Sequence, residues 1–175
     1  MRRSRSKIQG EFPAGILLPG VPVQLPDEHL SGKDGKIKTH VIELIKNNRM
    51  IDKLQENQYF VFGSNLAGRH GAGAAKFAHD NFGAEYGVGE GITGQCYAFP
   101  TLDENLRKRT NEELEKSRDS LFGCAGENND RIFLLTAVGC GLAGYAISEI
   151  APLFKNAPEN IVLPEEFLTF NGQQK

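Results

Sequence analysis

The chain of 175 residues is poor in cysteine and contains no long apolar run. Its cysteines are odd in number and none lies in a CxxC pair, which argues against a disulfide framework and a zinc site. No apolar stretch approaches the roughly 20 residues that a membrane helix needs. We therefore predict a reduced, cytoplasmic protein with no membrane partner, no metal and no cofactor. The cysteines are Cys96, Cys124 and Cys140.

The sequence also has little net charge, because a basic arm offsets an acidic body. Arg2, Arg3, Arg5 and Lys7 contribute four positive charges to a net charge of −2, so the rest of the chain carries −6. This balance argues against a broad nucleic-acid surface, which needs many basic side chains opposite phosphates. The arm is either a solvated tail or a contact to nucleic acid or to an anionic membrane.

Proline and glycine divide the chain into a lead and one domain. Residues 1–35 hold four prolines between positions 13 and 26 among frequent glycines, which predicts an extended or disordered lead. Residues 36–170 have the length of a single domain. It opens with an expected amphipathic helix, KIKTHVIELIKNN, whose apolar residues at helical spacing are Ile37, Val41, Leu44 and Ile45.

Strands and helices alternate through the rest of the domain. We expect strands within residues 58–63, 95–101, 130–139 and 160–164, and helices within residues 72–83, 110–123 and 146–154. Gly83 is expected to end the first of these helices, and Thr110 with Glu113 has capping-box spacing at the start of the second. This alternation predicts an α/β fold with a largely parallel sheet covered on both faces.

Two glycine-rich loops share one design. VFGSNLAGRHGAG (residues 61–73) and TAVGCGLAGYAISEI (residues 136–150) each leave an apolar strand, cross a glycine turn and enter an expected helix. Backbone N–H groups and a helix N-terminus at the carboxyl ends of strands suit a phosphate or diphosphate. Established fingerprints do not fit, because Lys76 replaces the third glycine of GxGxxG and no GK[ST] follows.

The two loops resemble those of the macro domain family, which binds ADP-ribose and in some members removes it from proteins or small molecules. The matching residues are Asn65 with Gly71-Ala72-Gly73, and the run from Gly139 to Tyr145, while GEGITGQCYAFPT resembles the family's central strand. The chain is most similar to a macro-like branch met in phages and bacteria. The resemblance covers residues 52–167 and implies a three-layer α/β/α mixed sheet.

It also implies a ligand and a site. We expect ADP-ribose, a related nucleotide diphosphate or an ADP-ribosylated substrate, with the diphosphate between the loops and the distal ribose against Asn65 and His70. These two residues are the catalytic candidates, although Ala75 stands where hydrolytic members often carry an acid. The expected ligand-binding residues are Asp52, Gly63, Ser64, Asn65, His70, Gly71, Ala72, Gly73, Val138, Gly139, Cys140, Gly141, Leu142, Ala143, Gly144 and Tyr145.

Each candidate has a simpler alternative. Asn65 either holds a ribose hydroxyl or bonds its own loop, and His70 is either a base or ribose donor or an exposed loop residue. Arg69 either clamps phosphate or lies free on the surface. Tyr145 either stacks on a ribose or caps the core. Cys140 is either a nucleophile or a small buried residue of a turn.

A different class of function stays open at this point. In this alternative the chain is a non-enzymatic module that binds nucleic acid or a protein through its basic arm. Salt-sensitive binding that requires residues 1–7 would favour this alternative.

Overall fold

The computed structural model describes residue 51 and residues 53–172. The predicted lead of residues 1–35, the predicted helix at residues 36–48 and Asp52 lie outside the described residues. Within them, no helix is long and apolar enough to cross a membrane.

The described chain has an α/β fold built on a mixed five-stranded sheet with the order β2-β3-β1-β4-β5. Its central strands are β1 (Gln58–Asn65), β3 (Cys96–Leu102) and β4 (Ile132–Leu135), and β5 (Ile161–Val162) forms one edge. These four strands are parallel, whereas β2 (Gly91–Thr93) pairs antiparallel with β3 at the other edge. The largely parallel sheet predicted from the sequence is therefore confirmed.

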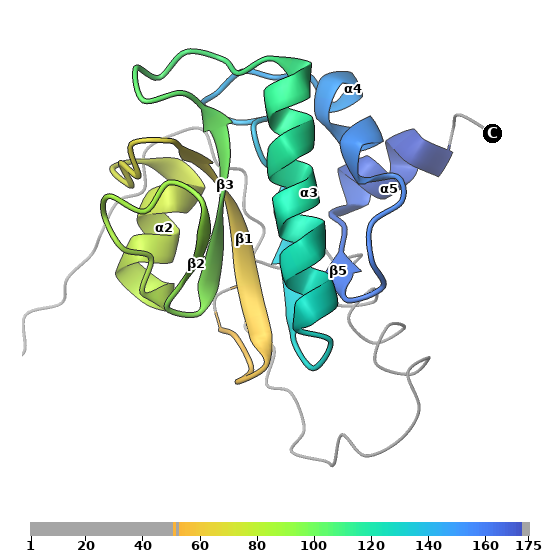
Figure 1. Ribbon diagram of the computed structural model, residues 1–175, viewed down its shortest axis with the longest axis horizontal. Helices are drawn as coiled ribbons and strands as arrows, with labels where there is room; N and C mark the ends of the chain where they lie inside the picture. The colour runs from red at the N-terminus through yellow and green to blue at the C-terminus, as the bar shows by residue number, and fades with distance from the viewer. Residues whose placement is uncertain (1–50, 52, 173–175) are drawn as a thin grey trace, which may run out of the picture.

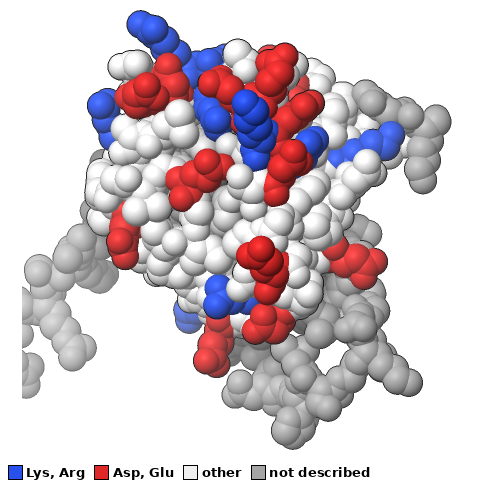
Figure 2. Space-filling view, in the orientation of Figure 1, with Lys and Arg blue, Asp and Glu red and all other residues white. Residues whose placement is uncertain are grey.

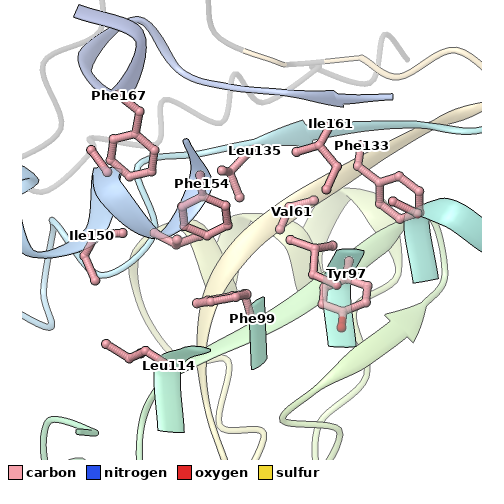
Figure 3. Packing of buried hydrophobic residues seen from close by; sticks show 14 of the residues in the cluster. Val61, Tyr97, Phe99, Leu114, Phe133, Leu135, Ile150, Phe154, Ile161 and Phe167 are labelled. Carbon is pink, nitrogen blue, oxygen red and sulfur yellow. The ribbon is translucent and has the colours of Figure 1, made fainter. Parts of the chain in front are cut away.

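The two faces of the sheet bury different apolar clusters. On one face, Phe60 and Phe62 of β1 pack with Ala75 and Ala78 of α2 (Gly73–Phe82). On the other face, Val61 belongs to a larger cluster that includes residues of α3 (Asn111–Glu127), η1 (Ala151–Phe154) and α5 (Glu165–Gly172). Figure 3 shows part of this larger cluster around Phe99 and Phe154. The alternation along β1 follows from the period of two along a strand.

Local signals place the helix ends where the sequence predicts them. Gly83 follows α2 with φ 79°, the left-handed conformation that glycine adopts without strain. At the start of α3 the Thr110 side chain accepts from the backbone N–H of Glu113, and the Glu113 carboxylate accepts from the N–H of Thr110, which completes the capping box.

Several elements differ from the sequence-based expectation. The strand expected within residues 130–139 is limited to Ile132–Leu135, and the helix expected over 146–154 consists of a short α4 (Ile147–Ile150) followed by η1. Pro152 lies in this 3-10 turn, where its missing N–H is tolerated. The sequence does not predict strand β2 or helix α5. Strand β2 has three residues and α5 has eight residues that follow a proline, and segments this short show too little apolar periodicity to be recognised.

Candidate functional site

The two glycine-rich loops meet at the carboxyl edge of the sheet. Strands β1 and β3 run towards the top of the view in Figure 1, and the loops that follow β1 and β4 leave the sheet at that edge. A Cβ at Gly63 would lie 3.2 Å from the backbone nitrogen of Gly139, and one at Gly73 would lie 3.2 Å from Cδ1 of Leu142. The sequence-based expectation that both loops share one edge is confirmed.

Part of the first loop is occupied by contacts within the protein. The Asn65 amide donates to the Arg69 carbonyl at 2.9 Å and accepts from the Arg69 N–H at 3.1 Å. Asn65 therefore makes the bonds to its own loop that the simpler alternative predicts, while a bond to ribose stays a prediction. The Arg69 side chain lies on the exposed surface.

The segment from Glu85 to Gly89 packs against the first loop and forms hydrogen bonds with it. The Ser64 hydroxyl donates to the Gly89 carbonyl at 2.8 Å, and the Gly87 N–H donates to the Gly68 carbonyl at 3.0 Å. A Cβ at Gly68 would lie only 2.4 Å from the Val88 nitrogen. Gly68 thus lets two backbone segments approach each other, a purpose unrelated to any ligand.

The end of the first loop, by contrast, presents free donors. Within the described residues, the backbone N–H groups of residues 71–75 make no hydrogen bond, and no side chain caps the N-terminus of α2. The first turn of α2 contains no acidic residue. Gly71 and Ala72 are exposed, so the first of these donors open towards solvent at the positive end of the helix dipole.

The second loop has the same division between internal bonds and free donors. Three of its N–H groups bond inside the loop: Cys140 to Ala137, Gly144 to Gly141 and Tyr145 to Gly139. The N–H groups of residues 141–143 make no hydrogen bond within the described part of the chain. Leu142 lies between these donors and is 82% exposed. An anion at this tip would find three consecutive backbone donors.

Lys108 and Tyr145 fix the outer side of the second loop. The Lys108 ammonium donates to the Gly144 carbonyl at 2.7 Å and lies 4.4 Å from the centroid of the Tyr145 ring. The Tyr145 hydroxyl lies 3.0 Å from the carbonyl oxygens of both Thr101 and Arg109, which share its one proton, and the side chain is buried. Tyr145 therefore caps the core. Lys108 is a cation beside the loop that the sequence-based list missed, because only the folded chain brings residue 108 next to residue 144.

His70 is fully buried, which corrects the alternative of an exposed loop residue. Its ring packs edge-on against Phe62 and lies 5.7 Å from the Tyr86 ring between centroids. Nε2 lies 3.2 Å from the Val88 carbonyl, while Nδ1 is buried and has no hydrogen-bond partner among the described residues. The aromatic neighbours that exclude water come from β1 and from the segment after α2, so the sequence around His70 did not reveal them.

Burial also sets the protonation state of His70. Desolvation lowers the pKa of His70 below its ordinary value of 6.5, although the backbone groups of Glu85 and Val88 act in the opposite direction. The fold thus favours the neutral imidazole, whereas the unfolded chain takes up a proton as the pH falls through the ordinary value. We expect the free energy of unfolding to decrease as the pH is lowered from 7 through 6.5 and to level off below the folded-state pKa.

Urea unfolding at a series of pH values measures this dependence. In a His70→Gln variant the amide can still donate to Val88, and the His70 part of the pH dependence should disappear. His79→Gln is the matched control, since it removes the neighbouring exposed imidazole and leaves the buried one. An unchanged pH profile in His70→Gln would show that His70 is not responsible.

Cys140 does not have the environment of a nucleophile. Burial, with smaller effects of Glu166 and Glu149, raises the pKa of the Cys140 thiol to about 11, so the thiol stays protonated at neutral pH. The described residues contain no group of His, Cys, Asp and Glu side chains that could hold a metal ion.

Charges around the site are mixed. Figure 2 shows acidic and basic side chains interspersed at the top of the view, with no continuous patch of one sign on this face. Recognition at the loops would therefore depend on local donors rather than on a broad field.

The chain matches no protein-family model, and comparisons with curated proteins and with solved structures give no significant match.

The structure brings most of the predicted site residues to one edge of the sheet but gives them different environments. Gly71, Ala72, Gly141 and Leu142 surround the free donors. The buried members are Ser64, Asn65, His70, Val138, Gly139 and Tyr145. Half-buried members are Gly63, Gly73, Cys140 and Ala143, and Gly144 is exposed.

Proposed function

We propose that the chain is a three-layer α/β/α macro-like protein that binds ADP-ribose or a related nucleotide diphosphate at the carboxyl edge of its sheet. The observation that supports this is the pairing of two runs of free backbone N–H groups, residues 71–75 and 141–143, on loops in contact through Gly73 and Leu142. Each run suits one phosphate, and the contact between the loops suits two phosphates joined by an oxygen bridge.

The proposed binding mode uses backbone groups first. The phosphate nearer α2 accepts from the first-turn N–H groups and gains from the helix dipole. The second phosphate accepts from the tip of the second loop, and the Lys108 ammonium at Gly144 adds positive charge on its outer side. The Asn65 amide keeps the first loop in shape for this contact through its two bonds to Arg69.

Calorimetric titration tests the proposal directly. ADP-ribose, ADP, AMP and a short RNA are titrated into the full chain and into a chain lacking residues 1–7. Saturable binding of ADP-ribose that is unaffected by the deletion supports the proposal. Binding of RNA alone, lost with the arm and at high salt, would favour the nucleic-acid module instead.

Ala72 offers a test of the first donor run. Ala72 is exposed and has extended backbone (φ −152°), so Ala72→Glu should keep the fold, and its charge even suits a helix N-terminus. The added carboxylate would repel a phosphate there, and we expect ADP-ribose affinity to fall at least tenfold, about 1.4 kcal/mol. Ala72→Gln has the same size without the charge and should weaken binding less. Thermal melting with and without ligand measures both, and an undiminished ligand-induced shift in Ala72→Glu would place the phosphate elsewhere.

If the site hydrolyses an ADP-ribosyl bond, Asn65 and His70 are the proposed catalytic residues. We expect turnover of protein-linked ADP-ribose to be slow or absent, because Ala75 supplies no base and His70 is fully buried. Release of ADP-ribose followed by chromatography checks this. Rapid turnover that His70→Ala abolishes would show that the loop opens and that His70 supplies the base.

A cytoplasmic location fits this proposal. Nucleotides of this kind are intracellular substrates, and the three cysteines are all free thiols.

A further inference from the structure

A hollow lies at the amino edge of the sheet, at the opposite end of the strands from the glycine-rich loops. Its volume is about 600 Å³, which is in the range of small-molecule sites. The residues that precede β1 and β4 form it together with the start of β1: Gln55, Glu56, Asn57, Tyr59, Asp130 and Arg131.

Strand pairing and local hydrogen bonds fix the residues that line this hollow. Tyr59 pairs with Phe133 in the sheet, and their rings are in contact at 5.7 Å between centroids. The Ile132 N–H donates to the Asn57 carbonyl at 2.8 Å, and the Asn57 amide reaches the Asp130 carbonyl at 3.4 Å. A ligand here would therefore meet a surface that is already formed.

The lining of the hollow includes a stacked pair. The Arg131 guanidinium lies over the Tyr59 ring, 4.8 Å from its centroid, and both residues are half-buried. A planar cation on an aromatic ring offers a flat surface on which another flat ring can stack. Such platforms bind nucleobases in many single-stranded complexes.

The rim adds charged groups that the described protein leaves unpaired. The carboxylates of Glu56 and Asp130 are exposed, and neither they nor the Arg131 guanidinium form an ion pair or a hydrogen bond within the described residues. The lining carries two carboxylates and one guanidinium, a balance that disfavours a simple anion. The polar lining disfavours a purely apolar ligand, and the guanidinium disfavours a simple cation.

The ligand that fits these groups is a flat ring whose edge carries hydrogen-bond donors. Carboxylates only accept hydrogen bonds. Among the common bases, guanine alone presents two adjacent donors, N1–H and N2–H₂, on its Watson–Crick edge. Adenine and cytosine place one amino donor beside an acceptor, which a carboxylate would repel.

We propose that this hollow binds a single unpaired guanine base. The base stacks against the Arg131–Tyr59 pair, and its N1–H and N2–H₂ groups donate to the carboxylate of Glu56 or Asp130. The source is a free nucleotide or a single strand. This site is independent of the ADP-ribose site proposed above.

Guanosine is the probe, because it has the base and lacks the phosphates that the glycine loops would bind. Amide chemical shifts of the ¹⁵N-labelled full chain are followed during titration with guanosine, inosine and adenosine. We expect saturable shifts at residues 55–59 and 130–131, with affinity in the order guanosine, inosine, adenosine, because inosine lacks the N2 amino group. Absence of saturable shifts at these residues, or equal affinity for all three nucleosides, would overturn the proposal.

Substitutions test the two recognition elements separately. Arg131→Gln removes the stacking cation and should weaken guanosine binding about tenfold. Arg118→Gln is the matched control, since Arg118 also lies over an aromatic ring, Phe122, but on helix α3. If Arg131→Gln fails to fold, the double change Glu56→Gln and Asp130→Asn, at exposed positions, still tests the site. It should abolish the preference for guanosine over adenosine, and a retained preference would overturn the proposed edge contact.

Two further arms identify the source of the base. Titrations with 5′-GMP and with an oligothymidylate that contains one guanine, each followed at the amides of residues 55–59 and 130–131, distinguish a free nucleotide from a single strand. Tighter, salt-sensitive binding of the oligonucleotide indicates a strand, and equal or tighter binding of 5′-GMP indicates the nucleotide. Gly141→Val should leave guanosine binding unchanged in either case.

Discussion

Gly68→Ala is expected to destabilise the fold severely, by about 3 kcal/mol or more. Gly68 has φ +61°, a left-handed conformation in which a Cβ costs about 1–2 kcal/mol. The new Cβ would also lie 2.4 Å from the Val88 nitrogen and 2.5 Å from the Gly87 carbonyl carbon, which are backbone atoms that cannot turn away. The melting temperature should fall by roughly 10 °C, or the variant should fail to accumulate as folded protein.

Gly71→Ala is the control for this prediction. It lies in the same loop, but its φ is outside the left-handed range, and among the described residues a Cβ there would meet only the Tyr86 hydroxyl, at 4.0 Å. We expect its melting temperature to stay within a few degrees of the unchanged protein. Equal stability of the two variants would mean that the segment around Val88 does not hold the first loop in solution.

Most of the sheet could be predicted because its central strands are strongly apolar and short-range signals separate them. Phe60, Val61 and Phe62 form a continuous apolar run that is buried on both faces, as parallel strands require. Gly83 and Thr110 act through their own conformations and hydrogen bonds, so their effects can be read locally. In the strand order, β3 lies beside β1 and β5 beside β4, each pair parallel, and α3 carries the chain from β3 past β1 to β4.

What could not be predicted depends on contacts between distant segments. The antiparallel β2 contains two small or polar residues out of three and is a strand because β3 pairs with it. Helix α5 depends on Phe167, which is fully buried against a cluster formed by other elements. The apolar spacing over residues 146–154 does correspond to helical turns. Pro152, however, interrupts the regular hydrogen bonds and leaves α4 only four residues long.

In the candidate site, too, the local sequence indicates some features, while contacts between distant segments decide the others. The glycine content of both loops indicated close backbone approach, but it could not say to what. At Gly68 and Gly89 the approaching atoms belong to the protein itself, whereas a Cβ at Gly141 would meet no atom of the described residues within 4 Å. Only the folded structure separates glycines that serve packing from one that leaves a surface open.

Gly141→Val is therefore expected to abolish ADP-ribose binding in a folded protein. The isopropyl group would stand beside the free N–H groups of residues 141–143, where the proposed phosphate would lie. Packing offers no reason for instability, because the surroundings are open, φ lies outside the left-handed range and the residue is exposed. The loss should be at least a hundredfold, about 2.7 kcal/mol, if the backbone donors carry most of the phosphate recognition.

Calorimetry measures the loss of ADP-ribose affinity, and a series of side chains of increasing size tests whether covering the donors causes it. Gly141→Ala adds one methyl group and should weaken binding less than valine does, because it covers fewer of the three donors. Gly126→Val is the control for adding valine at an exposed, open glycine, since Gly126 lies near the end of α3 and outside both loops. If Gly141→Val melts like the control and still binds ADP-ribose normally, the second loop is a plain turn, because a phosphate held by those donors cannot share their space with a branched side chain.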